Sequence, residues 1–302
     1  LPIYYRLLYR ADTLIATETS AHMHIFRGGN YYSRKALLDK KFIFLQHGVT
    51  YMKPHDKASS YTAGKEGEPD YIVVNSEKEA NIVSSMLGID RERCIVSGMI
   101  IFDRLDYCHI GPDSDDLVVI MCTWLHTEEH MLSHFMDSVS YHKVVQIFDE
   151  IRKFIPEEKI RIVPHPKISA LMKKTDLNKS LWTGSVSDAL RDAKLLITDY
   201  SSICYNVFYQ GGAVIFYQPD LEEYESKVGR LIPDDDEYIG KRAFSAGELS
   251  DIIREGISEN GIIDLSCFRN SEYENRYKKI NAFSDGKNTE RLVSFLSDHD
   301  II

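Results

Sequence analysis

Residues 195–202 read Leu-Leu-Ile-Thr-Asp-Tyr-Ser-Ser, and a helix-like segment at 203–210 follows directly. A short apolar run that ends in polar residues is typical of a buried strand in a parallel sheet. A helix that begins at the carboxyl end of such a strand offers N–H groups and hydroxyls to an anion. Ser201 and Ser202 therefore favour phosphate binding, and simple capping of the helix by Ser or Asp is the alternative. The stretch predicts an α/β fold with a phosphate-binding strand end.

The same alternation of short apolar runs and longer amphipathic segments extends along most of the chain. Strands are predicted at 13–16, 42–45, 71–75, 94–97, 117–121, 160–163, 195–198 and 213–217, and helices at 77–87, 141–154, 186–192 and 203–210. Such alternation indicates βα units and parallel sheets. A polar, turn-rich stretch at 111–116 divides the series, so we predict an N-terminal lobe at 1–108 and a C-terminal lobe at 112–302. The first series is short and lacks an initiator Met, so the N-terminal lobe is expected to be incomplete.

The overall composition limits the class of protein. The chain has 302 residues, 43 % of them hydrophobic, and a formal net charge of −10. This charge argues against a general nucleic-acid binder, which needs a basic face. The five cysteines are scattered and odd in number, which favours a reduced, cytoplasmic chain over a disulfide-bonded secreted one. No apolar run approaches the roughly 18 residues that a membrane-spanning helix needs.

Three further predicted strands also end in polar motifs, and open α/β sheets bind ligands at such ends. In the first, the apolar run 42–45 is followed by Gln46-His47-Gly48. Imidazole titrates near neutral pH, so His47 is able to accept a proton from a hydroxyl nucleophile. Gly48 would let a substrate approach the backbone closely. The alternative is that His47 only hydrogen-bonds within a turn.

The second motif follows the run 117–121, where the sequence continues with Cys122-Thr123-Trp124. The hydroxyl of Thr123 is able to hydrogen-bond a phosphate or the edge of a nucleobase. Trp124 either lines the pocket or belongs to the ordinary core, since large aromatic side chains are commonly buried.

The third motif follows the run 160–163, where His165 stands between two prolines. The prolines restrict the backbone at the strand end and so hold the imidazole in place. As a cation or hydrogen-bond donor, His165 would neutralise charge that builds on a departing phosphate. A turn with an incidental histidine is the alternative.

Taken together and in this order, the motifs resemble those of the CDP-glycerol glycerophosphotransferase family, which includes teichoic acid primases and polymerases and related capsule polymerases. The resemblance rests on Gln46-His47-Gly48, Cys122-Thr123-Trp124, His165-Pro166, Thr198-Asp199-Tyr200-Ser201-Ser202 and Phe283-Ser284-Asp285-Gly286-Lys287. It implies a GT-B fold, in which two Rossmann-like lobes face a cleft. The acceptor would bind mainly to the N-terminal lobe and the donor mainly to the C-terminal lobe.

The resemblance also implies a reaction and the residues that carry it. A polyol-phosphate unit, such as glycerol phosphate, would pass from a CDP-activated donor to a hydroxyl of a teichoic-acid or capsule polymer, with release of CMP. His47 would be the general base, and His165 would hold the donor pyrophosphate. The donor would also be bound by Gly48, Thr50, Thr123, Thr198, Asp199, Ser201, Ser202 and Asn206. Members of the family generally need no catalytic metal, and no cofactor is expected.

The chain departs from the family pattern at three places. The usual G-x-P-R-x-D segment is Gly-Met-Ile-Ile-Phe-Asp at 98–103 and lacks its arginine. Val163 stands where an arginine usually lies two residues before the HP histidine, and Asn206 stands where an aspartate is common. Arg104 and Arg161 are candidates to supply the missing positive charge. The polyol of the donor therefore stays open between glycerol, ribitol and others.

Three rival interpretations remain open at this point. One is a GT-B enzyme that uses a nucleotide sugar, and another is a GT-B lobe that binds without catalysis. The third is a metal site, because His126, His130 and His134 recur at a helical spacing of four beside Glu128 and Glu129. The metal interpretation is disfavoured, since the zincin order H-E-x-x-H is absent.

The expected location follows from the acceptors of the family, which are lipid-linked or polymeric. The resemblance implies a peripheral position on the cytoplasmic face of the membrane. Residues 4–10 mix aromatic, apolar and basic side chains, as helices at a membrane interface do. A core helix of the N-terminal lobe would also have this mixture of side chains, and the core helix is the favoured interpretation.

Overall fold

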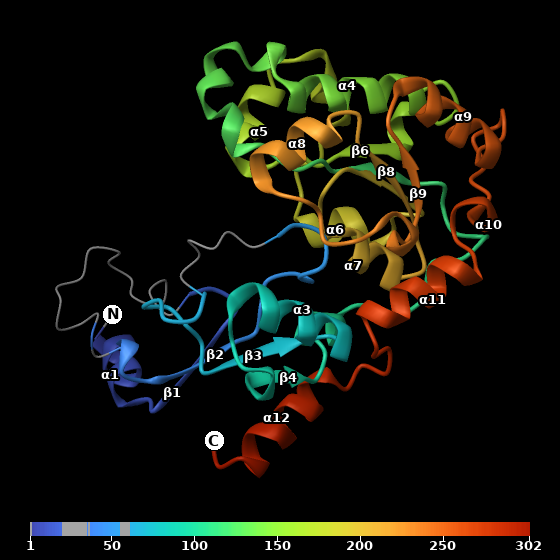
Figure 1. The fold of residues 1–302 in the computed structure, drawn as a ribbon. Coiled ribbons are helices and arrows are strands. Elements are labelled where there is room, and N and C mark those ends of the chain that lie inside the picture. Colours follow the sequence, from blue (N-terminus) through green and yellow to red (C-terminus); the bar gives the residue numbers. More distant parts are fainter. Residues whose placement is uncertain (1, 20–34, 36, 55–60) are drawn as a thin grey trace. The chain divides into compact units, whose positions relative to one another are not determined.

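The computed structural model describes residues 2–19, 35, 37–54 and 61–302 (Figure 1). The chain divides into two compact units, of which the first combines Leu1–Arg104 with Lys278–Ile302 and the second is Leu105–Tyr277. Each unit has its own sheet.

The first unit is built on a four-stranded parallel sheet. Its strands lie side by side in the order β1 (Thr13–Ala16), β2 (Lys41–Phe44), β3 (Tyr71–Val74) and β4 (Cys94–Val96). Among the described residues, the helices of this unit include α1 (Pro2–Arg10), α3 (Glu77–Leu87), α12 (Asn288–Asp298) and the short η2 (Arg91–Arg93) and η3 (Ile100–Arg104).

Both faces of this sheet are covered, because side chains alternate between them along each strand. Phe42 and Phe44 of β2 pack in one cluster with the buried side chains of α1 and α3. Ile43 of β2 faces the other way and packs with Leu292 and Leu296 of α12. The sheet is therefore the middle layer between helices (Figure 1).

The C-terminal segment belongs to the first unit, whereas the sequence predicted a C-terminal lobe that ran from 112 to 302. Two contacts explain this difference. Leu292 and Leu296, one helical turn apart, bury an apolar face of α12 against the first sheet. The Asp103 carboxylate, which follows β4, accepts hydrogen bonds from Asn288 N at 2.9 Å and from Thr289 N at 2.7 Å. Asp103 therefore caps the start of α12 from 185 residues away in the chain.

Replacing Asp103 with alanine should loosen α12. Two N–H groups at the start of the helix lose their acceptor, so we expect a loss of about 2 kcal/mol in the free energy of unfolding. Amide hydrogen exchange in residues 288–298 should accelerate. Asp285→Ala is the matched control, because it removes a surface ion pair with Arg291, which contributes little, and only one long hydrogen bond of 3.2 Å, from the Lys287 N–H before α12. Equal exchange in both variants would contradict this role of Asp103.

The second unit has a five-stranded parallel sheet in the order β6-β5-β7-β8-β9. The strands are β5 (Val118–Ile120), β6 (Ile160–Ile162), β7 (Leu195–Thr198), β8 (Ala213–Tyr217) and β9 (Lys241–Ala243). Counted from its first strand, this order is 2-1-3-4-5, the order of flavodoxin-like doubly wound sheets. Its switch point, where the direction of winding reverses, lies between β5 and β7.

Helices surround the second sheet and bury both of its faces. They are η4 (His126–Asp137), α4 (Val139–Ile151), η5 (Glu157–Lys159), α5 (Pro166–Met172), η6 (Asp176–Ser180), α6 (Val186–Arg191), α7 (Cys204–Tyr209), α8 (Leu221–Val228), η7 (Asp235–Glu237), α9 (Ala246–Gly256), α10 (Leu265–Phe268) and α11 (Ser271–Ile280). Ile147 of α4 and Ile253 of α9 pack on one face with Val118 and Ile197. The predicted α/β fold with parallel sheets is confirmed.

Candidate functional site

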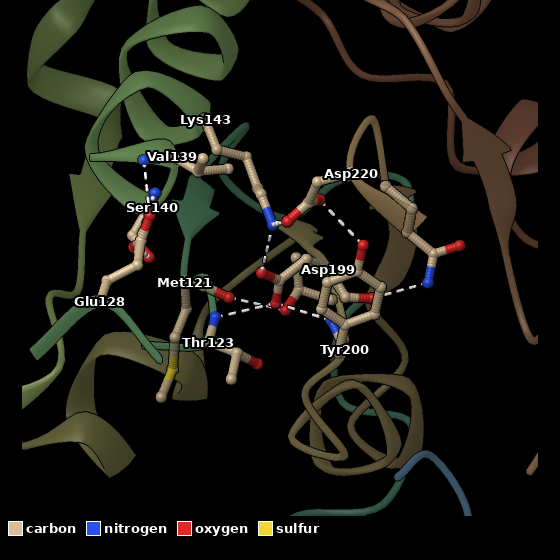
Figure 2. Close-up of polar contacts among 11 residues, drawn as sticks. Met121, Thr123, Glu128, Val139, Ser140, Lys143, Asp199, Tyr200 and Asp220 are labelled. Carbon is tan, nitrogen blue, oxygen red and sulfur yellow. Dashed lines mark hydrogen bonds and ion pairs between the residues drawn. The ribbon is translucent and has the colours of Figure 1, made fainter. Parts of the chain in front are cut away.

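The carboxyl ends of β5 and β7 lie side by side at the switch point of the second sheet. Ile120 pairs with Ile197 in the parallel ladder, and the Met121 N–H donates to the Ile197 carbonyl at 3.1 Å. The Thr198 hydroxyl then donates to the Met121 carbonyl at 2.6 Å. This arrangement brings the loop that carries Thr123 next to the loop at 199–202 (Figure 2).

Asp199 joins these two loops. One carboxylate oxygen accepts the N–H of Thr123 at 2.8 Å and the N–H of Tyr200 at 2.6 Å. The other oxygen faces Lys143 at 3.1 Å. Asp199 and Thr198 are both fully buried. Both were predicted to contact the donor, but their side chains are placed to hold the loops rather than to touch a ligand.

Ser201, Ser202 and Asn206, all within seven residues after Asp199, are half-buried. The serines lie in the turn before α7, which begins at Cys204. The Ser201 hydroxyl accepts the N–H of Ile203 at 3.4 Å, a long hydrogen bond that caps this turn only weakly. Both hydroxyls therefore lie at the switch point with capacity for a further partner.

Thr123 and Trp124 each bury one polar atom without a hydrogen-bond partner among the described residues. These atoms are the Thr123 hydroxyl oxygen and the Trp124 indole nitrogen. Trp124 is only 4 % exposed and packs near Phe135 in the core of this unit, which favours the core interpretation of this residue. The Thr123 hydroxyl lies instead at a strand end, where a buried polar atom needs a ligand or water as its partner.

His165 lies at the end of β6, the strand next to β5. Its imidazole Nδ1 accepts the N–H of Lys167 at 3.3 Å and so caps α5. Because Nδ1 acts as an acceptor, the neutral ring carries its proton on Nε2. His165 is half-buried at this strand end.

The arginines considered as replacements have other contacts or belong to the other unit. Arg161 is within β6, and its guanidinium stacks on Trp182 with 4.4 Å between the guanidinium carbon and the ring centre. Val163, where the family usually has an arginine, is buried. Arg104 belongs to the first unit. At this strand end the second unit therefore offers hydroxyl and imidazole groups, while Arg161 is engaged with Trp182.

His47 lies in the first unit, at the end of β2, and its side chain is exposed. The preceding residue, Gln46, has a φ of 58°, a left-handed conformation that is uncommon for a non-glycine residue. Its side-chain amide donates to the Val73 carbonyl at 2.6 Å, and its amide oxygen accepts the Thr50 hydroxyl. This backbone strain, fixed by buried hydrogen bonds, points His47 out of the sheet edge.

The sequence interpretation missed Glu79, which supports the same loop. Glu79 is fully buried on α3 and accepts the N–H of Thr50 at 2.7 Å and the N–H of Asn75 at 2.6 Å. Burial raises the pKa of the Glu79 carboxyl, while its N–H donors oppose that shift. Ser76 and Glu79 form an S-x-x-E capping pattern, which was a visible signal. Thr50 is therefore part of the loop's support, and the half-buried Gly48 lies between it and His47.

Removing the Glu79 carboxylate should displace the His47 loop. In Glu79→Ala, the buried N–H groups of Thr50 and Asn75 lose their acceptor, so we expect about 3 kcal/mol less stability. A shift of the loop by about 1 Å would lower activity by roughly 10- to 100-fold. Ser76→Ala is the matched control, because it removes only the cap of α3, at about 1 kcal/mol. Urea unfolding and initial rates would measure both effects. Full activity in Glu79→Ala would disprove the supporting role.

The structure also bears on the histidines at 126, 130 and 134. They lie in η4, where His134 has a φ of −126° and a ψ of 43°, so the segment is kinked rather than a regular helix. Within residues 2–19, 35, 37–54 and 61–302, no group of three or more His, Cys, Asp or Glu side chains is arranged to hold a metal ion. Figure 2 shows Glu128 turned toward the backbone of α4 instead.

Membrane attachment was expected through the acceptor rather than through a spanning segment. In α1, Leu8 is buried in the first unit, while Ile3 and Leu7 are exposed. Among the helices in the described ranges, none combines the length and apolar character that crossing a bilayer requires.

Two curated relatives resemble the chain in sequence. It is 24 % identical over 241 residues to the teichoic acid glycerol-phosphate primase of Bacillus subtilis (strain 168), which covers 76 % of this chain and 58 % of the primase. It is 22 % identical over 293 residues to the minor teichoic acid biosynthesis protein GgaB of the same organism, which covers 87 % of this chain and 30 % of GgaB. The chain thus spans less than two thirds of the length of either relative.

A solved structure and a family model also match this chain. A solved structure of the wall teichoic acid polymerase TagF with CDPG matches at a TM-score of 0.66 and 15 % identity, over 100 % of this chain and 76 % of the TagF chain. The family model for CDP-Glycerol:Poly(glycerophosphate) glycerophosphotransferase matches residues 3–298. This match covers nearly the whole sequence, and the chain therefore belongs to the CDP-glycerol:poly(glycerophosphate) glycerophosphotransferase family.

Proposed function

We propose that this chain transfers a polyol-phosphate unit from a CDP-activated donor to a hydroxyl of a teichoic-acid or capsule polymer and releases CMP. Family membership and the name of the primase relative support the reaction class. The observation that carries the proposal is the switch point of the second sheet. There the Thr123 hydroxyl, which has no partner among the described residues, lies on a loop joined to that of Ser201 and Ser202, where sheets of this order bind nucleotides.

In the proposed division of work, the second unit binds the CDP donor and the first unit receives the acceptor. The Thr123 and serine hydroxyls and the Nε2–H of His165 hydrogen-bond the donor. Gly48 and Asn206 complete the predicted contact residues, while Thr50, Thr198 and Asp199 hold the loops. Hydrogen bonds to the oxygens of a diphosphate are strong, because these acceptors are ionised.

The chemistry then needs one base and one stabilised leaving group. His47 takes the proton of the acceptor hydroxyl, and the freed oxygen attacks the β-phosphorus of the donor. A new P–O bond forms while the bond between the β-phosphorus and the bridging oxygen breaks. CMP leaves with that oxygen and its negative charge, which the His165 N–H stabilises. The product gains a phosphodiester, and the proton on His47 passes to solvent.

The test is to incubate the full chain with CDP-glycerol and, separately, CDP-ribitol, each with a polyol-phosphate acceptor, and to follow CMP by chromatography. CMP release with one donor would establish the reaction class and name the polyol. Release of UDP from a UDP-sugar, with none of CMP, would favour a nucleotide-sugar enzyme instead. Adding phospholipid vesicles that carry a lipid-linked acceptor would test whether the transfer takes place at a membrane surface. We expect a higher rate with the vesicles than without them.

A further inference from the structure

Lys143 is a buried cation behind the candidate donor site. Its side chain is 1 % exposed, and its ammonium lies 3.1 Å from a carboxylate oxygen of Asp199 and 2.8 Å from one of Asp220. The start of α4, which carries Lys143, is itself fixed, because Glu128 accepts the N–H groups of Val139 at 2.7 Å and Ser140 at 3.2 Å. Figure 2 shows the Lys143 side chain reaching down from α4 to both aspartates.

The two aspartates connect this ammonium to three strand ends. Asp199, after β7, binds the N–H of Thr123 after β5, as described above. Asp220, after β8, accepts the hydroxyl of Tyr200 at 2.8 Å. The Gln218 amide, also after β8, donates to the Asp199 carbonyl at 3.1 Å. The network therefore holds the two loops that carry the candidate donor contacts.

One positive charge lies between two negative charges in this network and offsets one of them. Burial lowers the pKa of Lys143, but the nearby Asp199 and Asp220 carboxylates more than offset it, and the net pKa lies above the ordinary value. The other titratable groups that face this cluster are Cys122, Tyr200, Tyr217 and Tyr224, and burial raises the pKa of each of them. They are therefore neutral near pH 7, and the charge balance rests on Lys143.

We propose that Lys143 is a positioning residue for transfer from the CDP donor, because its buried ammonium sets the spacing between the loops after β5 and β7. This inference rests on the proposed function. Without the ammonium, two buried carboxylates repel each other and Asp199 shifts. The N–H of Thr123 and the N–H of Tyr200 follow Asp199, so the Thr123 hydroxyl and the serine turn move away from the donor.

The test compares Lys143→Met with Lys194→Met. Lys194 is equally buried, with a side chain 1 % exposed, and its ammonium lies 2.9 Å from Asp116 at the opposite, amino end of the sheet. Both variants remove a buried, paired ammonium, so both should be less stable. Only Lys143→Met is expected to lose activity, by about 100-fold in kcat/KM for CDP-glycerol or CDP-ribitol, whichever wild type uses.

A second variant separates charge balance from lost packing. Lys143→Met combined with Asp220→Asn removes one charge of each sign and keeps an oxygen that accepts the Tyr200 hydroxyl. We expect it to regain about tenfold in kcat/KM over Lys143→Met, since breaking a pair costs more than removing it. Equal losses in Lys143→Met and Lys194→Met, or no recovery in the double variant, would overturn the proposal.

Amide hydrogen exchange keeps this inference separate from the proposed reaction. If wild type releases no CMP from either donor, the proposed function fails, but the N–H groups of Thr123 and Tyr200 still report on the network. Faster exchange of both in Lys143→Met, with wild-type exchange in Lys194→Met, would support the positioning role. Unchanged exchange in Lys143→Met would overturn it.

Discussion

His47→Ala is expected to lower the rate of CMP release by about 100- to 10,000-fold, the range that a general base contributes. The donor KM should change less than the rate, because His47 belongs to the first unit and all the proposed donor contacts except Gly48 belong to the second. Initial rates at varied donor concentration, with a saturating acceptor, would measure both.

A second exposed histidine of the first unit provides the control for His47→Ala. His47 is exposed, so its replacement should change stability by less than about 0.5 kcal/mol. His299→Ala removes another exposed histidine of the first unit, at the end of α12, and should keep full activity. Comparable rates in His47→Ala and His299→Ala would remove His47 from the reaction.

The strands could be predicted because buried parallel strands are continuous apolar runs. All eight predicted runs coincide with strands of the two sheets to within one or two residues. The ninth strand, β9, was missed because it reads Lys-Arg-Ala and lies at a sheet edge. Its one signal is Gly240, where an added Cβ would lie 2.1 Å from the Val214 carbonyl oxygen. Such a close approach depends on tertiary contact, which local sequence does not encode.

The division into units was less predictable for the same reason. A polar linker is visible in sequence, but the return of α12 to the first sheet depends on contacts between residues almost 200 positions apart. The segment at 98–103 lacks the family's arginine, yet it keeps Asp103, which caps α12. Gly98 in the same segment leaves room for the Asn288 amide, which would lie 2.5 Å from an added Cβ. Part of this motif therefore serves the fold.

The site residues that directly follow predicted strands could be predicted from the sequence. The buried residues that hold those strand ends in place could not. Thr123, His165, Ser201 and Ser202 follow apolar runs directly, so parallel topology alone gathers them at one edge. Lys143 lies within an amphipathic helix, where a lysine ordinarily faces solvent. Only the packing of α4 against the strand ends shows that it is buried with Asp199.

His165→Ala is expected to lower kcat/KM for the donor by about 100- to 1,000-fold, as the loss of one preorganised hydrogen-bond donor does. Part of any effect could come from α5, because the Lys167 N–H also loses its acceptor, at about 1 kcal/mol. His165→Asn resolves the two contributions. Asparagine is a good N-cap, so this variant should recover the stability lost in His165→Ala, yet it lacks the imidazole Nε2–H.

Calorimetric titration with CMP would add a reading that does not depend on turnover. If His165 binds the departing phosphate, both variants should bind CMP about tenfold or more weakly, since a hydrogen bond to a charged group contributes about 1.5–3 kcal/mol. If His165 only caps α5, His165→Asn should match wild type in both CMP affinity and rate, and the imidazole would have no part in the chemistry. The half-buried ring at the end of β6, with Nδ1 already engaged, makes the first outcome the expected one.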